Sequence, residues 1–311
     1  MNKLIKQAFT LIELLVVIAI IGILSGLIVV TMNGVTNSAN IAKSQVFSNS
    51  LRNALMMNLV SEWKFDQINV PAANQTPDSW GTNTGTLNGA GGSQNLPQLQ
   101  TTGCMFGNCL QFDGTDDYVD CGNGANLQIT SAITISAWAY IDPAGGMNGT
   151  YGYVVAKTEG NPATGGYSLW FDDRGGSTIN SIRSYGIASD TTLFDLIAQN
   201  AIPVAGWYYL VATYNKDDIA PQAKLYINAV QRHTYTFSKA MKSDLFTVKI
   251  GDVDGTQPNF AGKIDDVRIF NAAMPTSQIK ELYYSGLNNL LSSHSITNEE
   301  YLSKINNITS K

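Results

Sequence analysis

The chain has 311 residues, of which 44% are apolar and 14% charged, and its formal net charge is −5. The 19 Lys and Arg are scattered along an acidic chain, which excludes a basic groove for nucleic acid. Three Cys and two His leave almost no material for a Cys/His zinc site. Much of the polar remainder is Asn, Thr, Ser and Gly, which is typical of β-rich extracellular proteins.

The longest apolar run covers residues 11–30, a length suited to crossing a bilayer at ~1.5 Å per residue. Lys3 and Lys6 precede it and the next basic residue is Lys43, so the positive-inside rule predicts a cytoplasmic N-terminus and an outward-facing body. A secretory signal peptide has a shorter apolar core. A plain anchor gives no reason for Glu13, because an ionisable side chain in an apolar helix costs about 2.5–3.5 kcal/mol.

Residues 6–14, Lys-Gln-Ala-Phe-Thr-Leu-Ile-Glu-Leu, resemble the processing site of type IV pilins and type II secretion pseudopilins. The resemblance implies that a prepilin peptidase cuts between Ala8 and Phe9, that Phe9 is methylated, and that Glu13 is needed for assembly. Ala8 departs from the usual Gly before the cut but is still small. In a filament the Phe9 amine would be a buried cation, which Glu13 of the same or a neighbouring subunit can neutralise.

Beyond residue 30 the apolar residues recur at helical spacing. They are Ile41, Val46, Phe47, Leu51, Ala54, Leu55 and Leu59. We therefore predict a leader over 1–8 and one long helix over 9–60, which spans the membrane over about 9–31 and is amphipathic after that.

The body of the chain changes to short β-rich segments separated by Gly, Asn, Asp and Pro turns, which favours an all-β sandwich. Residues 132–141 alternate between two sets of side chains, as expected for a strand with two different faces. The clearest predicted strands are 109–112, 118–121, 132–141, 153–156, 167–171, 207–214, 224–227, 247–250 and 263–270. The predicted fold class is α+β overall, a long N-terminal helix followed by an all-β two-sheet sandwich.

Five segments in chain order resemble the laminin G-like, concanavalin A-like jelly roll. They are 112–119 (FDGTDDYV), 133–139 (ITISAWA), 206–213 (GWYYLVAT), 224–228 (KLYIN) and 262–271 (GKIDDVRIFN). Residues 275–283 resemble the short helix that closes this fold. The jelly roll is accordingly expected over 61–286. A C-terminal tail follows over 287–311, with a short helix opened by a capping box at 297–300.

The resemblance also implies a structural calcium ion between the first and last strands. The matching residues are Asp66, Asp78, Asn83 and Asp265. Calcium takes six to eight oxygen ligands, which suits carboxylates mixed with Asn and loop carbonyls. The alternative is that these residues simply make turns. Asp113, Asp116 and Asp117 are interpreted as the tip of a hairpin, with Asp-Gly turn chemistry.

The three cysteines allow one disulfide, with two alternative pairings, in an outward-facing domain where disulfides persist. Cys104 and Cys109 could close a local loop. A hairpin centred on Thr115 would instead place Cys109 opposite Cys121. We favour Cys104–Cys109, which leaves the predicted 109–121 hairpin free of cross-strand strain and leaves one thiol unpaired.

The sequence argues against an enzyme. Glucanases of this fold need two facing carboxylates, and the candidate strands hold no such cluster. Sugar-stacking aromatic residues are available, and the candidate ligand-binding residues are Trp80 and Trp170. Trp138 and Trp207 lie within apolar strands and are predicted to be core.

These observations predict a pilin-like, minor-pilin subunit that assembles through its helix into a filament or pseudopilus and displays a jelly-roll head for surface adhesion. The expected partners are the prepilin peptidase, other pilin or pseudopilin subunits, the inner membrane, and an extracellular glycan or protein. The precursor is expected in the bacterial inner membrane and the mature protein on the cell surface. Two alternatives are a pseudopilin with a purely structural head in a secretion or DNA-uptake machine, and a membrane-tethered glycan hydrolase.

Overall fold

The computed structural model describes residues 18, 57–67, 74–89, 96–145, 147, 149–158, 165–175, 180–253 and 259–309. The chain divides into two compact units, Met1–Ala54 and Leu55–Lys311. The predicted leader, Ala8, Phe9, Glu13 and nearly all of the predicted long helix lie outside the described residues. Within the described part of the chain, no helix is both long and apolar enough to span a membrane.

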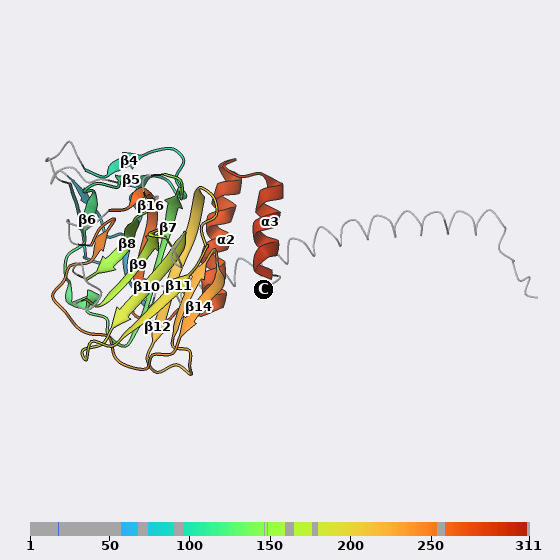
Figure 1. Cartoon of the computed structure of the whole chain (residues 1–311). Coiled ribbons are helices and arrows are strands. Elements are labelled where there is room, and N and C mark those ends of the chain that lie inside the picture. Colours follow the sequence, from blue (N-terminus) through green and yellow to red (C-terminus); the bar gives the residue numbers. More distant parts are fainter. Residues whose placement is uncertain are drawn as a thin grey trace, which may run out of the picture. The chain divides into compact units, whose positions relative to one another are not determined.

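The second unit is built on two antiparallel sheets of eight strands each (Figure 1). Sheet A has the order β14 (Val230–Tyr235), β13 (Ala223–Ile227), β12 (Gly206–Asn215), β7 (Ala132–Ile141), β16 (Ala261–Phe270), β5 (Cys109–Asp113) and β4 (Gln98–Gln100), with β1 (Leu59–Trp63) paired to β16. Sheet B has the order β11 (Leu193–Ala198), β10 (Ser181–Ile187), β9 (Tyr167–Asp172), β8 (Tyr151–Lys157), β15 (Lys249–Ile250), β6 (Tyr118–Asp120), β3 (Gly85–Asn88) and β2 (Gln75–Thr76).

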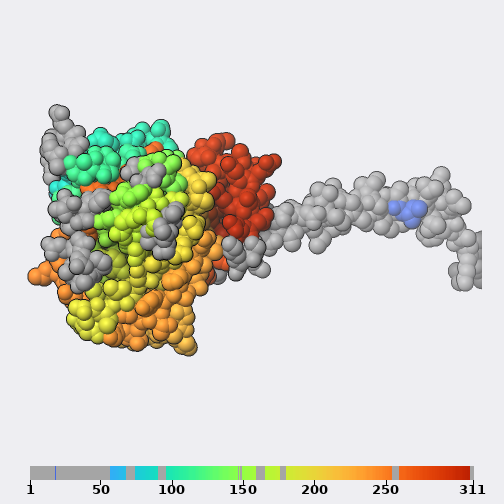
Figure 2. Space-filling view, in the orientation of Figure 1, coloured from blue at the N-terminus to red at the C-terminus, as the bar shows by residue number. Residues whose placement is uncertain are grey.

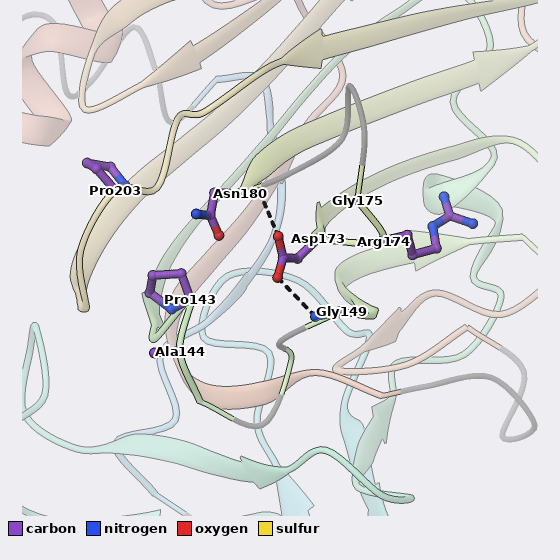
Figure 3. Close-up of a pocket in the computed structure, with 8 residues that line it drawn as sticks. All are labelled: Pro143, Ala144, Gly149, Asp173, Arg174, Gly175, Asn180 and Pro203. Carbon is purple, nitrogen blue, oxygen red and sulfur yellow. Dashed lines mark hydrogen bonds between the residues drawn. The ribbon is translucent and has the colours of Figure 1, made fainter.

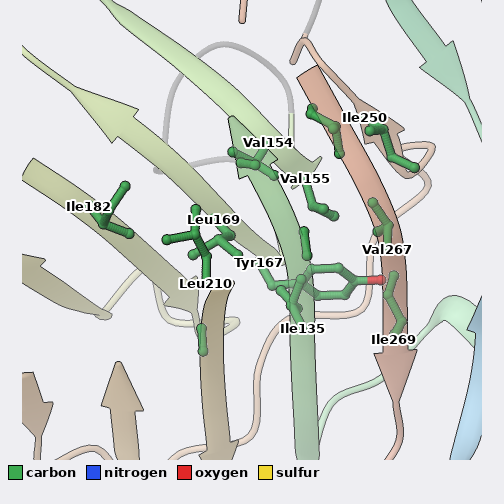
Figure 4. Packing of buried hydrophobic residues seen from close by; sticks show 14 of the residues in the cluster. Ile135, Val154, Val155, Tyr167, Leu169, Ile182, Leu210, Ile250, Val267 and Ile269 are labelled. Carbon is green, nitrogen blue, oxygen red and sulfur yellow. The ribbon is translucent and has the colours of Figure 1, made fainter. Parts of the chain in front are cut away.

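The main core lies between the two sheets (Figure 4). Strand β7 contributes Ile133, Ile135 and Ala137 to it, while Leu169 and Ile182 enter from sheet B. Burying each large aliphatic side chain contributes about 1.5–3 kcal/mol before chain entropy is subtracted. The alternation over 132–141 that predicted a two-faced strand is therefore the alternation between this core and the opposite face of sheet A.

That opposite face is also buried, because helices α2 (Thr276–Ser292) and α3 (Asn298–Thr309) pack on it. The Trp138 ring of β7 stacks on Tyr283 of α2 with centroids 5.6 Å apart. Ile308 of α3 joins the same cluster. Helix α2 continues well beyond the predicted end at residue 283, so the predicted boundary at 286 falls inside a helix. The predicted tail is thus a packed part of the domain.

Helix α3 begins with the capping box read from the sequence. The Thr297 backbone N–H donates to Glu300 Oε2 at 2.8 Å, and the Glu300 N–H donates to Thr297 Oγ1 at 3.2 Å. Two backbone donors at the helix start are thereby satisfied.

The predicted hairpin over 109–121 is wrong. Strand β5 lies in sheet A beside β16 and β4, whereas β6 lies in sheet B beside β15 and β3. Phe112 points into the core from sheet A, and Val119 points into it from sheet B. In the predicted hairpin centred on Thr115 these two side chains would lie on opposite faces of one sheet, so they could not share a core. The connection at 114–117 therefore carries the chain from one sheet to the other.

The first strand also begins earlier than expected. Leu59 and Val60 belong to β1, which pairs with β16, and not to the end of the predicted helix. The clearest predicted strands included no counterpart of β2, β3, β4, β10, β11 or β14.

Candidate ligand-binding face

The outer face of sheet B carries a compact group of aromatic and charged side chains from β8, β9 and β10. The strand register places Tyr153 opposite Trp170, and Trp170 opposite Arg183. Because side chains alternate along a strand, the neighbours two residues away share this face. We call Tyr151, Tyr153, Trp170, Arg174 and Arg183 the aromatic–arginine cluster. Figure 2 shows this side of the molecule, with the described residues between 151 and 198 in yellow-green to yellow.

The aromatic rings of the cluster hold one another in place. Trp170 and Tyr153 stack with ring centroids 5.3 Å apart and planes 19° apart. Tyr151 meets both rings edge-on, at 5.6 Å from Trp170 and 6.0 Å from Tyr153. Such pairs contribute about 0.5–1.5 kcal/mol each beyond the area they bury.

Two guanidinium groups cover these rings. Arg183 Cζ lies 4.6 Å from the Trp170 ring centroid, and Arg174 Cζ lies 5.2 Å from Trp170 and 4.5 Å from Tyr151. Trp170 is consequently only 4% exposed, whereas the Arg174 side chain is 46% exposed. The structure thus places the predicted candidate Trp170 beneath the arginines, and Arg174 is the group that reaches solvent.

Carboxylates fix both arginines. Arg174 donates through Nε and Nη2 to the two oxygens of Asp172 at 2.9 Å each, and Arg183 Nη1 donates to the same Asp172 at 2.9 Å. Arg183 also pairs with Asp195 of β11. Burial tends to raise the pKa of Asp172, but the hydrogen bonds from Arg174 and Arg183 outweigh it and lower that pKa. Asp172 therefore stays charged at neutral pH.

A hollow of about 580 Å³ adjoins the cluster and shares Arg174 with it. Its lining residues are Pro143, Ala144, Gly149, Asp173, Arg174, Gly175, Asn180 and Pro203 (Figure 3). Asp173 accepts hydrogen bonds from the backbone N–H of Gly149 and of Asn180, at 3.0 Å each. Asn180 Oδ1 is buried without a hydrogen-bond partner among the described residues. The volume lies in the range of small-molecule sites.

Three other tryptophans lie outside this cluster. Trp80 is 46% exposed in the loop after Asp78, outside the aromatic–arginine cluster. Trp138 is core, as predicted. Trp207 is half-buried, and its Nε1 donates to the carbonyl of Gly103 at 3.3 Å.

The four residues matched to a calcium site have other partners in the structure. Both oxygens of Asp78 accept backbone N–H groups, with Glu62, Gly81 and Asn83 at 2.9, 2.8 and 3.1 Å among the donors. Asp78 Oδ1 accepts three backbone N–H groups and is not available to a cation, so Asp78 is a poor ligand for the calcium ion that the fold implies. The residues present therefore do not fit that site as one set.

The remaining two carboxylates of that set lie against the loop between Cys104 and Cys109. Asp265 Oδ2 accepts from the N–H of Met105 at 3.0 Å and of Phe106 at 2.8 Å. Asp66 Oδ1 accepts from the N–H of Asn108 at 3.0 Å.

The same loop is closed by a disulfide between Cys104 and Cys109, with Cα atoms 5.5 Å apart. Cys121 is a free, buried cysteine. The alternative bridge from Cys109 to Cys121 depended on the hairpin that the structure does not contain.

Comparison with known families agrees with this architecture. Residues 113–280 match the family described as the concanavalin A-like lectin/glucanases superfamily. The chain belongs to this superfamily. Residues 5–29 of this superfamily member match the prokaryotic N-terminal methylation motif, and that range includes Ala8, Phe9 and Glu13. No curated protein matches the chain.

Among the solved structures similar to this superfamily member are binding domains of clostridial toxins. The binding domain of Paraclostridial Mosquitocidal Protein 1 is 16% identical, with a TM-score of 0.56, over 75% of this chain and 53% of that one. The botulinum neurotoxin serotype D ligand-binding domain, in complex with N-acetylneuraminic acid, is 15% identical, with a TM-score of 0.55, over 76% and 53%. The serotype G binding domain is 12% identical, with a TM-score of 0.54, over 74% and 51%. The chain thus spans about half the length of these structures, and the likeness is one of fold.

Sequence reasoning missed the charged half of the face. Arg183 and Asp195 lie on β10 and β11, which had no predicted counterpart. Residues 181–187 (SIRSYGI) do not alternate regularly between apolar and polar side chains, so the sequence held no clear signal for this strand.

Proposed function

We propose that this chain is a pilin-like, minor-pilin subunit whose jelly-roll head binds an extracellular glycan on the outer face of sheet B. The observation that carries the proposal is the prearranged Arg174. Its guanidinium is held by Asp172 and by two aromatic rings, is 46% exposed, and borders the adjoining hollow. Glycan sites combine such fixed polar groups with aromatic surface.

The charge arrangement favours binding over hydrolysis. A glycosidase needs one carboxyl that stays protonated to act as general acid, together with a second carboxylate. Asp172 has a lowered pKa, and Asp195 is paired with Arg183. A membrane-tethered hydrolase is therefore the weaker alternative, and polysaccharide turnover by the purified chain would support it.

The N-terminal methylation motif supports the part of the proposal that concerns membrane insertion, processing and assembly. The precursor would lie in the inner membrane with its head outside. The prepilin peptidase would process it, and other pilin or pseudopilin subunits would assemble with it. A similar toxin domain was solved in complex with N-acetylneuraminic acid, which makes glycans the first ligand class to test for this head.

A glycan array probed with the full-length chain in detergent tests the binding half. We expect the unaltered chain to bind at least one glycan class, and Arg174→Ala to weaken that binding about tenfold, the effect of losing about 1.4 kcal/mol. Lys216→Ala is the matched control, because Lys216 is a cation paired with Asp217 in the turn after β12. Unchanged binding by Arg174→Ala would contradict the assigned face. A lack of glycan binding by the unaltered chain would favour the purely structural head of a pseudopilin.

A further inference from the structure

The connection between β5 and β6 brings three carboxylates together. Asp113, Asp116 and Asp117 each offer one oxygen, and these three oxygens all lie within 4.8 Å of one another. We propose that this turn binds one calcium ion, at a site separate from the calcium site that the fold implies.

Asp117 is the residue that points to a cation. Its side chain is 3% exposed, and its Oδ2 accepts the backbone N–H of Asp113 at 2.9 Å. Its Oδ1 is buried and has no hydrogen-bond partner among the described residues. A buried carboxylate oxygen without a partner carries the desolvation penalty of an unsatisfied buried acceptor, which is larger when the group is charged. A bound cation removes that penalty.

The neighbouring charges increase the need for a cation. Neither Asp113 nor Asp117 has a salt bridge to a described Lys or Arg. Three carboxylates held this close together repel one another, and a bound cation offsets that repulsion.

The spacing of the oxygens suits calcium. Calcium–oxygen distances of 2.3–2.6 Å place ligands on opposite sides of the ion about 4.6–5.2 Å apart. Magnesium, at 2.0–2.1 Å, requires its ligands within about 4.2 Å. Asp113 is exposed, so water molecules can complete the six to eight oxygens that calcium takes.

The site would have a defined structural effect. Asp113 is the last residue of β5 in sheet A, and Asp117 directly precedes β6 in sheet B. An ion held by both would fasten the point where the chain passes from one sheet to the other. The inference does not rest on the proposed glycan binding.

Calorimetric titration of calcium chloride into the EDTA-treated full-length chain in detergent tests this site. We expect one site that is saturated below about 1 mM calcium, the weak end of protein calcium affinities. Asp117→Asn and Asp116→Asn should each lower the affinity at least tenfold. Asp142→Asn is the matched control, because Asp142 is also an exposed turn carboxylate that caps a backbone N–H, that of Ala144.

A second control separates this site from the one that the fold implies. Asp265→Asn should leave calcium binding unchanged. The proposal is overturned if the unaltered chain takes up no calcium at about 1 mM, or if Asp265→Asn abolishes binding while Asp117→Asn retains it. Near-ultraviolet circular dichroism checks folding, and if Asp117→Asn does not fold, the half-buried Asp116→Asn decides the test.

Discussion

Asp265 shows how a single buried carboxyl can set the pH dependence of this domain. It is fully buried under the loop between Cys104 and Cys109, and its Oδ1 has no hydrogen-bond partner among the described residues. Burial, and to a smaller extent the charge of Asp266, raises its pKa to about 8 from an ordinary 3.8. The fold therefore favours the protonated acid. Its stabilising contribution is complete below about pH 4 and is lost as the pH rises towards 8.

The variant Asp265→Asn should remove this dependence. Asn keeps the side-chain oxygen that accepts the N–H groups of Met105 and Phe106, and it carries no charge. In urea denaturation we expect the unaltered chain to lose on the order of a few kcal/mol between pH 5 and pH 8.5. The variant should lose much less over that interval and should match or exceed the unaltered chain at pH 8.5. Equal destabilisation of the variant at both pH values would contradict the assignment.

At the scale of the element, the contact of α2 with sheet A depends on a glycine. A Cβ at Gly286 would lie 2.2 Å from Cζ2 of Trp138, far inside van der Waals contact. Gly286→Ala would gain about 1 kcal/mol in helix propensity. It would also force the Trp138 ring away from its stack on Tyr283.

We therefore expect Gly286→Ala to destabilise the domain by about 1–3 kcal/mol, because overpacking outweighs the helix gain. The urea midpoint measures this change. Ser285→Ala, at the exposed neighbouring position, should have almost no effect or be slightly stabilising. A more stable Gly286→Ala variant would show that α2 does not approach Trp138 so closely.

Elements with a clear period could be predicted from the sequence, and pairings between distant segments could not. Strand β7 follows from its alternation, and α3 from its capping box, because both signals are local. The division of β5 and β6 between two sheets depends on long-range partners, so a hairpin was the natural local interpretation. Trp170 was a reasonable ligand-binding candidate, but Arg183, one of the two arginines that cover it, comes from β10. Sequence spacing contains no direct signal for that contact.

At the scale of the whole molecule, the two faces of the sandwich have different roles. Helices α2 and α3 bury the outer face of sheet A, including Trp138 and Tyr209. The outer face of sheet B instead presents the aromatic–arginine cluster and the hollow beside it. The proposed ligand site on sheet B and the helical cover on sheet A both follow from this layered architecture. The proposed binding face therefore lies within the second unit, Leu55–Lys311.

The last prediction concerns how the N-terminal unit is processed and how the protein assembles. Residues 5–29 match the N-terminal methylation motif, so N-terminal mass spectrometry of membrane-extracted protein should show a mature chain that begins at a methylated Phe9. Glu13→Ala should leave this cleavage intact and abolish filament assembly. The reason is that the Phe9 amine would then lack a neutralising carboxylate in an apolar bundle. Ala8→Gly, which restores the usual residue before the cut, is the control and should be cleaved at least as fast. A mature chain that begins at any other residue would overturn the pilin-like assignment while leaving the binding face of the head untouched.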